Sequence, residues 1–293
     1  MISQLRCVAV AILATATLSH GEVRYQSTSG DIYVVAHQDD WQLFMGDVVA
    51  ARLEAKRAAT FIFLTAGDDG RDSLYWRTRE LAALQSTQIA GGARATDAEN
   101  GCAPRTVRTH IVRECVAGDT RSIFMRLPDG NRDGRGFARY GNQSLRKLRR
   151  QSIGSITAVD GSATYNGWSD LISTITALTD SHENGTATIH TSDPSVAINP
   201  HDHFDHRMAG LSVADARLST THDTRYYVGY ALGTRAANRS AKEIRDKTAI
   251  FRAYEAAMTR VNSGWSAYAE HRAFYSQCML RTYWRRAPRR RGS

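Results

Sequence analysis

The chain has 293 residues, of which 42% are apolar and 23% charged, so it can bury a sizeable core and has the composition of a globular protein. Its formal net charge of +9 would suit a nucleic-acid binder, but six arginines lie in residues 281–293, where there is no acidic residue. Without these six and Arg6, 31 of the 38 Lys and Arg remain against 29 acidic residues, so we expect no nucleic-acid partner for the rest of the chain.

Residues 1–21 have the pattern of a secretory signal peptide. Arg6 precedes an apolar stretch at 7–18, and Ser19-His20-Gly21 follow it. The stretch is too short to span a bilayer, and no other segment is long and apolar enough to cross one. We therefore expect a secreted or periplasmic protein without a membrane span.

Strand and helix patterns alternate beyond residue 21. Strands are predicted at 31–35, 58–66, 105–115, 121–127, 187–191 and 225–230, helices at 43–57, 75–90, 144–150, 168–179, 208–218 and 241–259, and a loop or short hairpin at 152–165. This alternation predicts an α/β fold with a mostly parallel sheet and right-handed crossovers. We expect one domain over residues 22–280. Residues 281–293 are expected to form a basic, disordered tail that could contact anionic surfaces.

The first candidate site follows the first strand, in the run Val34-Val35-Ala36-His37-Gln38-Asp39-Asp40. A strand-to-helix turn can aim His37 and Asp40 at one point, and together they supply two of the three protein ligands of a catalytic zinc. Asp39 lies between them and is free to act as a base. The alternative is an ordinary helix start, with Asp39 or Asp40 as N-cap.

The second candidate site is a histidine cluster. Three of the ten histidines, His201, His203 and His206, lie within six residues, with Asp202 and Asp205 among them. His203 and His206 share a helical face, so one could bind metal while the other faces the substrate, and Asp205 is close enough to orient an imidazole. A solvated polar loop or a surface metal-scavenging cluster is the alternative. No role is assigned to His201.

Together the two motifs resemble the PIG-L-like (LmbE-like) zinc-dependent N-acetylglucosaminyl deacetylases, which carry Ala-His-Pro-Asp-Asp-Glu and, later, His-Pro-Asp-His-x-x-x-Gly. Here residues 36–41 read Ala-His-Gln-Asp-Asp-Trp, and residues 203–210 read His-Phe-Asp-His-Arg-Met-Ala-Gly. Residues 61–68, 77–80 and 127–130 match further landmarks of the family, so the resemblance covers roughly residues 30–260. The departures at 38, 41 and 204 remove neither a ligand nor the base.

The resemblance implies a three-layer, Rossmann-like fold of LmbE type, with the site at the carboxyl ends of the strands. It also implies a zinc ion, with ferrous iron as an alternative, held by His37, Asp40 and His206. One three-ligand set is complete, and no second set is apparent in the sequence.

The resemblance assigns roles to the remaining polar residues as well. Asp39 would be the base that activates the zinc-bound water, and protonated His203 would stabilise the tetrahedral intermediate. Asp205 would hold His203 in the needed tautomer and raise its pKa. Arg77 and Asp129 stand where family members contact the substrate.

The implied activity is removal of an N-acetyl group from an amino-sugar-containing substrate: a glycan, a glycoconjugate or a sugar-bearing metabolite. Two alternatives stay open, a non-catalytic sugar-binding relative with a vestigial metal site and a metal-dependent phosphoesterase. The latter usually needs two metals and more carboxylates. No Gly-x-Ser-x-Gly motif indicates a serine nucleophile.

Three cysteines remain once the one in the signal segment is set aside. In an exported protein a disulfide between Cys102 and Cys115 would close a loop around a strand-like segment. Cys278 would then be unpaired, and its pairing with one of the other two is the alternative.

Overall fold

The computed structural model describes residues 30–92, 98–180 and 187–288. The expected signal peptide at 1–21 and residues 289–293 of the expected tail lie outside these ranges. Every helix within the described ranges is too short or too polar to cross a bilayer.

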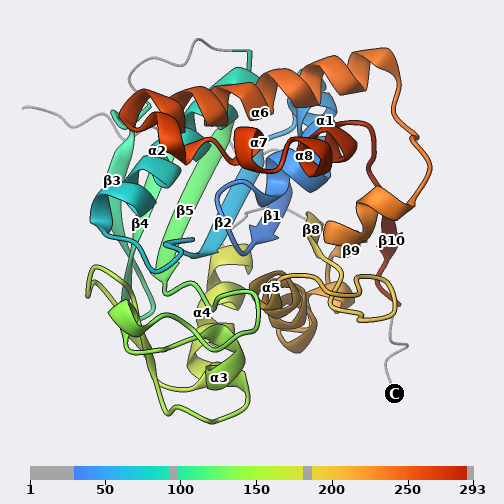
Figure 1. Ribbon diagram of the computed structural model, residues 1–293. Helices are drawn as coiled ribbons and strands as arrows, with labels where there is room; N and C mark the ends of the chain where they lie inside the picture. The colour runs from blue at the N-terminus through green and yellow to red at the C-terminus, as the bar shows by residue number, and fades with distance from the viewer. Residues whose placement is uncertain (1–29, 93–97, 181–186, 289–293) are drawn as a thin grey trace, which may run out of the picture.

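One eight-stranded sheet runs through the middle of the described structure (Figure 1). Its strands in chain order are β1 (Asp31–Val35), β2 (Ala59–Thr65), β3 (Cys102–Val107), β4 (His110–Ala117), β5 (Thr120–Leu127), β8 (Thr188–Ser192), β9 (Asp223–Tyr227) and β10 (Trp284–Arg286). They lie in the order β10-β9-β8-β1-β2-β5-β4-β3, and the five from β9 to β5 are parallel. The mostly parallel sheet expected from the sequence is therefore confirmed. A separate hairpin pairs β6 (Ile156–Thr157) with β7 (Thr164–Tyr165).

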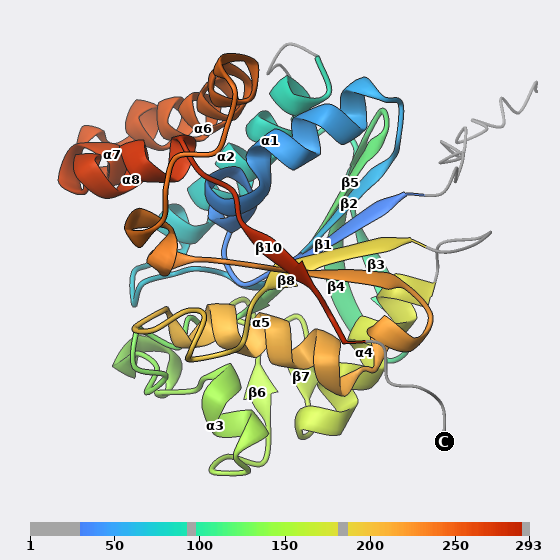
Figure 2. The ribbon, with the colours of Figure 1, turned by 90° about the vertical axis from the view of Figure 1, so that its right-hand side faces the viewer.

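Helices cover both faces of this sheet and complete three layers. The α-helices are α1 (Asp40–Glu54), α2 (Ser73–Ala90), α3 (Leu145–Arg149), α4 (Trp168–Asp180), α5 (Phe204–Asp215), α6 (Ala241–Val261), α7 (Ala267–Glu270) and α8 (Arg272–Met279). Short 3-10 turns are η1 (Ala138–Tyr140), η2 (Leu218–Thr220), η3 (Tyr230–Thr234) and η4 (Ser263–Trp265). Figure 2 shows α1, α2 and α6 on one face and α3, α4 and α5 on the other.

The central strands are apolar on both sides because each face is covered. Every residue of β1 and β2 is buried, so their runs of β-branched and aromatic residues do not alternate with polar ones. Tyr33 and Phe61 stack with ring centroids 5.1 Å apart on the α1 and α6 face. Ile32 and Ile62 pack on the opposite face, in the core beneath α4 and α5.

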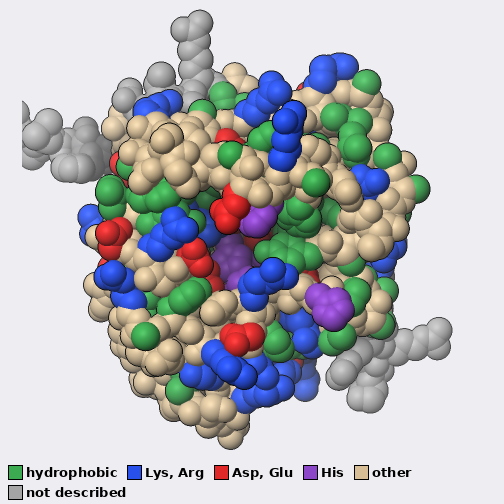
Figure 3. All heavy atoms as spheres, viewed as in Figure 1, with side chains coloured by type: hydrophobic (Ala, Val, Ile, Leu, Met, Phe, Trp, Pro, Cys, Tyr) green, Lys and Arg blue, Asp and Glu red, His purple; other side chains and the backbone are tan. Residues whose placement is uncertain are grey.

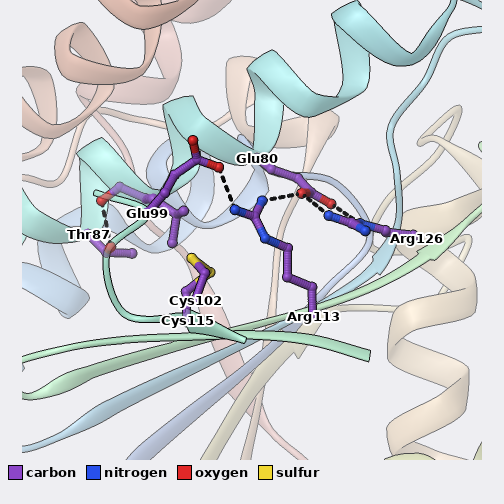
Figure 4. Close-up of a disulfide and its surroundings, with 8 residues drawn as sticks. Glu80, Thr87, Glu99, Cys102, Arg113, Cys115 and Arg126 are labelled. Carbon is purple, nitrogen blue, oxygen red and sulfur yellow. Dashed lines mark hydrogen bonds and ion pairs between the residues drawn. A yellow bond between two sulfur atoms is a disulfide. The ribbon is translucent and has the colours of Figure 1, made fainter. Parts of the chain in front are cut away.

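The segment predicted as a single strand at 105–115 is a hairpin instead. Its two strands, β3 and β4, meet at a turn where Arg108 has φ 55°, and no glycine or proline marks that turn in the sequence. Cys102 lies opposite Cys115 in this hairpin, and the expected disulfide joins them (Figure 4). Cys278 is free and buried. Arg113 of β4 also binds Glu80 of α2, which ties the hairpin to that helix.

The expectation of a disordered tail is wrong for residues 281–288. Residues 284–286 form β10, which pairs with β9 antiparallel. Arg285 makes two bonds to the buried carboxylate of Asp193, at 2.6 and 2.9 Å. The ammonium of fully buried Lys247 donates to the backbone oxygen of Arg281 at 2.7 Å and to the hydroxyl of Thr282 at 2.9 Å. The excess of arginines at 281–293 gave no indication of Asp193 and Lys247 as partners, because both are distant in sequence.

Candidate metal and active site

The two sequence motifs meet at the point where the strand order reverses. From β1 the chain continues to β2 and β5 on one side, whereas β8 and β9 lie on the other side of β1. Neighbouring loops at the carboxyl ends of β1 and β8 therefore diverge and leave a crevice, where ligands bind in sheets of this kind. His37 follows β1 directly. The histidine cluster follows β8 and opens α5, which begins at Phe204 and not at 208 as predicted.

Three buried side chains present their ligand atoms to one point in this crevice. His37 Nδ1 lies 3.3 Å from His206 Nε2, which lies 2.9 Å from Asp40 Oδ1, and Asp40 Oδ1 is 3.6 Å from His37 Nδ1. Two imidazoles and a carboxylate are typical ligands of a catalytic zinc. Ligands about 2.05 Å from a tetrahedral zinc are separated by about 3.3 Å, so this triangle fits the ion. The three ligands expected from the sequence are thus brought together.

Fixed hydrogen bonds aim these ligand atoms. Asp40 accepts the backbone N–H groups of Ala36 and His37 on Oδ2, at 3.0 and 2.9 Å, which leaves Oδ1 for the site. The other ring nitrogen of His206, Nδ1, lies 2.9 Å from Asp202 Oδ1. A carboxylate behind a ligating imidazole fixes its tautomer and orientation. Asp202 is a functional residue that the sequence analysis left without a role. Its spacing of four residues before His206 was the available signal.

The acidic surroundings hold positive charge at the two imidazoles. Burial alone would lower the pKa of His37, but Asp40, then Asp205 and Asp129, raise it well above its usual value. Asp40 and then Asp202 likewise overcome burial and raise the pKa of His206. A divalent cation would replace the protons that these carboxylates favour.

A second donor set overlaps the first, although the sequence indicated none. It consists of His37, Asp129, His203 and Asp205, all buried, and it could also hold a metal ion. His37 takes part through its other nitrogen, Nε2, which lies 3.5 Å from Asp205 Oδ2 and 3.6 Å from Asp129 Oδ2. No hydrogen-bond partner of this buried nitrogen is found among the described residues.

The predicted roles of His203 and Asp205 need correction. The backbone N–H of Asp205, not its carboxylate, bonds His203, and it donates to Nδ1 at 3.1 Å. The proton of neutral His203 is therefore on Nε2. Burial, followed by the charge of His37, lowers the pKa of His203 to about 4, the opposite of the expected direction. The carboxylate of Asp205 faces His37 and accepts the N–H of Gly130 at 2.7 Å.

The arginine at the site is Arg79, and not Arg77 as expected. Arg79 is buried and pairs with the carboxylate of Asp39, which lines the cavity as a base must. The Arg79 guanidinium also donates to the backbone oxygen of Gly67 and to the hydroxyl of Tyr254, both at 2.8 Å. Arg77 is exposed, lies over the Trp76 ring and is not among the residues that line the cavity.

Asp68 is a second acid near the site that the sequence analysis did not single out. It is fully buried, and its carboxylate accepts the N–H groups of Asp129 at 2.7 Å and Gly70 at 2.9 Å. Burial, with the charge of Asp129 acting in the same direction, raises the pKa of Asp68 to about 7. Asp68 thereby positions Asp129, which lines the cavity.

The site opens into a cavity of about 640 Å³. Figure 3 shows this hollow, with histidine side chains at its bottom. Its outer wall is strongly aromatic and is built from α1, α2, α6, η3, η4 and α8, by Phe44, Tyr75, Tyr230, Tyr254, Trp265, Phe274 and Tyr275. His201 is also on this wall and is exposed. Helices α7 and α8, which the sequence did not predict, close this side.

A family model described as PIG-L, GlcNAc-PI de-N-acetylase, matches residues 32–217, more than half of the chain. This match is narrower than the range of roughly 30–260 over which the motifs resemble such enzymes. No curated protein matches the chain.

Several solved structures are similar to this one. A deacetylase triple mutant involved in the teicoplanin biosynthetic pathway is 11% identical, with a TM-score of 0.46, and the match covers 83% of this chain and 87% of that one. N,N'-diacetylchitobiose deacetylase from Pyrococcus horikoshii is 12% identical, with a TM-score of 0.45 and coverage of 90% and 85%. GalB, the 4-carboxy-2-hydroxymuconate hydratase from Pseudomonas putida KT2440, is 12% identical, with a TM-score of 0.43 and coverage of 86% and 83%. Because these TM-scores are low, the likenesses carry no weight for the activity of this chain.

Proposed function

This chain belongs to the PIG-L family of GlcNAc-PI de-N-acetylases, and from that premise we propose that it is an exported, zinc-dependent hydrolase that removes an N-acetyl group from an amino-sugar-containing substrate. The family supports hydrolytic N-deacetylation of a sugar-related compound. The observation that carries the metal dependence is the buried triangle of His37, Asp40 and His206. Ferrous iron is the alternative ion for the same ligands.

Zinc, when bound by these three residues, supplies a Lewis acid that lowers the pKa of a water to about 7. Asp39 accepts the proton of the attacking water as a new C–O bond forms, and Arg79 holds the Asp39 carboxylate toward the cavity. His203 is neutral and donates its Nε2 proton in a hydrogen bond to the developing oxyanion. When the C–N bond breaks, Asp39 returns its proton to the departing amine, which leaves acetate and the free amino sugar.

This division of roles differs from the one expected from the sequence. The resemblance implies a protonated His203 that stabilises the tetrahedral intermediate, but burial and the charge of His37 lower the pKa of His203 too far for it to carry that proton near neutral pH. Asp39 is then the base and afterwards the acid.

The cavity suits a sugar-bearing substrate. Its volume of about 640 Å³ lies within the usual range for small-ligand sites, and its polar bottom is combined with an aromatic wall. Amphipathic rings such as Tyr230 and Trp265 offer flat apolar faces with polar edges, which match the two kinds of surface of a sugar ring.

Two observations support export. Residues 1–21 have the pattern of a signal peptide, and the Cys102–Cys115 disulfide is typical of an oxidising compartment. Fractionation of the native host tests this part of the proposal, because recovery of the uncleaved chain in the cytosol would contradict it.

The decisive experiment measures acetate release from a panel of N-acetylated mono- and oligosaccharides, with the metal content determined on the same sample. Asp39→Asn is expected to lower kcat by about a hundred-fold or more, since general acid–base catalysis contributes at least that much. Asp246→Asn, a half-buried acid on α6 that does not line the cavity, is the matched control and should keep full activity. Turnover unchanged in Asp39→Asn or after chelation would refute the mechanism.

The second donor set keeps one alternative open. Its two carboxylates beside His203 and His37 are the kind of addition that a two-metal phosphoesterase requires. Two metal ions per chain together with release of phosphate from p-nitrophenyl phosphate would favour this reading over deacetylation. A sugar-binding relative without activity would bind N-acetylated sugars and release no acetate.

A further inference from the structure

A second, smaller pocket lies between α3 and α5 and is surrounded by arginines. Its volume is about 130 Å³, and we call it the arginine pocket, defined by Arg146, Arg149, Arg150, Arg207 and Phe204. Figure 3 shows Lys and Arg side chains gathered on this part of the face that also carries the histidines. Four like charges around one hollow are costly unless an anion joins them.

Three of these charges have no acidic partner among the residues that the structure describes. Arg149 pairs with Asp215 at 2.9 Å. Arg146, Arg150 and Arg207 make no ion pair with any carboxylate in the described part of the chain. The Nε atoms of Arg146 and Arg207 are buried and have no hydrogen-bond partner there. Partial burial and then the charge of Arg150 lower the pKa of Arg146, as expected where like charges are not compensated.

Phe204 holds two of these guanidinium groups together. The guanidinium carbons of Arg146 and Arg207 lie 4.2 and 5.1 Å from the centroid of its ring. Arginine stacks on aromatic rings and keeps the fork of N–H donors at its edge free for a planar or tetrahedral oxyanion. Since the ring is already covered by arginine, it cannot serve as a stacking platform for a nucleic-acid base.

The arginine pocket and the catalytic cavity share no lining residue, but two stretches of chain connect their linings. Phe204 directly follows His203, whose side chain lines that cavity, and neighbouring Cα atoms are about 3.8 Å apart. A second link is the loop after β5. Arg132 of this loop lines the cavity, and the backbone oxygen of the next residue, Asp133, accepts a hydrogen bond from Arg146. A single ligand long enough to reach across these links would therefore occupy both places.

We propose that the arginine pocket binds a single phosphate or sulfate ester group of the substrate, whose N-acetyl group lies in the catalytic cavity; this inference rests on the proposed deacetylase function. Arginine binds such groups through paired, charge-assisted hydrogen bonds. The pocket has space for a few water molecules and hence for one tetrahedral oxyanion, but not for an extended polyanion.

The test compares kcat/KM for deacetylation of N-acetylglucosamine oligosaccharides that are neutral, sulfated or phosphorylated. The wild-type protein should prefer one charged form by about ten-fold or more, since a hydrogen bond to a charged group contributes that much. The sulfated and phosphorylated arms identify which ester is recognised. The variant Arg146→Gln/Arg207→Gln should bring the ratio of charged to neutral substrate close to one.

Arg135→Gln is the matched control, because Arg135 is a nearby exposed arginine that pairs with Asp133 and does not line the arginine pocket. This variant should keep the preference of the wild type. An equal loss in Arg135→Gln would show that only general surface charge matters and would overturn the proposal. No preference in the wild-type protein would overturn it as well.

Calorimetric binding of inorganic sulfate and phosphate separates this proposal from the proposed function, because it needs no turnover. The zinc-loaded Asp39→Asn protein should bind one of the two ions, and the additional Arg146→Gln/Arg207→Gln change should weaken that binding about ten-fold or more. If ion binding depends on these arginines but the wild-type protein has no deacetylase activity, the proposed function is refuted and the anion pocket is supported. Unchanged ion binding, or a duplex DNA that binds with the same dependence on these arginines, would overturn the pocket.

Discussion

Asp202 shows how one carboxylate outside the ligand set can decide the strength of a metal site. Its bond to His206 Nδ1 fixes the orientation of that ring. Asp202→Asn is expected to lower zinc affinity about ten- to a hundred-fold, as is typical when such a supporting carboxylate is lost. Competition with a fluorescent chelator measures the change, with Asp246→Asn as control. An unaltered affinity would remove Asp202 from the site.

Arg79 and Arg77 provide a matched pair two residues apart. Replacement of Arg79 by Met leaves the partly buried carboxylate of Asp39 unpaired, so we expect a loss of about 3–5 kcal/mol in the free energy of unfolding and a loss of activity. Arg77→Met removes an exposed side chain and should change both by little. Urea unfolding and acetate release measure the two effects. If Arg77→Met lowered the activity more than Arg79→Met, the substrate-contact role first expected for Arg77 would be restored.

Asp68 should make the stability depend on pH. Its pKa is raised to about 7 in the fold, so its favourable contribution is complete below the unfolded value of 3.8 and is lost as the pH rises to about 7. Between about pH 5 and about pH 8 this group removes up to about 3 kcal/mol from the free energy of unfolding. Asp68→Asn should show a smaller fall over that interval in chemical unfolding. An identical pH profile in both proteins would contradict the shift.

Among the elements of the fold, the C-terminal segment at 281–288 holds neighbouring parts of the structure together. Truncation after residue 280 removes β10, the Arg285–Asp193 pair and both acceptors of Lys247. Because the buried carboxylate of Asp193 then loses its arginine, and buried Lys247 keeps only its ion pair with Asp47, we expect destabilisation by about 3–5 kcal/mol. Thermal unfolding measures it.

Removal of residues 289–293 alone is the control for this truncation. It takes away three arginines but none of these contacts, and the stability should remain that of the full chain. Equal melting temperatures for both truncations and the full chain would restore the idea of a tail without structure.

Periodicity predicted the central elements well and their limits less well. The apolar runs at 32–35 and 61–64 signalled strands covered on both faces, and the structure has β1 and β2 there. The prediction of a single strand at 105–115 was wrong because the turn between β3 and β4 has a left-handed residue, Arg108, that is not glycine. Helices α7 and α8 are short, and they are held by packing on α6 and by contacts distant in sequence. Such contacts leave no local pattern.

Some residues of the site could be predicted from the sequence, and others were not. His37, Asp40 and His206 could be named because metal ligands are restricted to a few residue types at fixed spacings. Asp202 and Arg79 were missed, since the choice between neighbouring acids or arginines depends on backbone direction at the start of α5 and along α2. The pKa of His203 likewise depends on burial and on His37, which only the fold brings near.

For the molecule as a whole, the metal should couple the two halves of the sheet. His37 and Asp40 follow β1, and His206 belongs to the part that follows β8, so one ion would join both. Zinc at about a thousand times its dissociation constant should add about 4 kcal/mol, or about 10 °C in Tm. Calorimetry with chelator and then with added zinc measures this. His206→Ala should not respond, and an equal response there would place the ion elsewhere.

Most of the aromatic wall of the cavity comes from a stretch of chain different from the one that carries the chemistry. The reacting groups lie within the part that matches the family, whereas Tyr230, Trp265 and Phe274 lie beyond its end at residue 217. Most of the wall that would contact the sugar is thus encoded apart from the reacting groups. Exchange of the C-terminal portion between relatives offers a route to new substrates, with the hydrolytic machinery inherited unchanged.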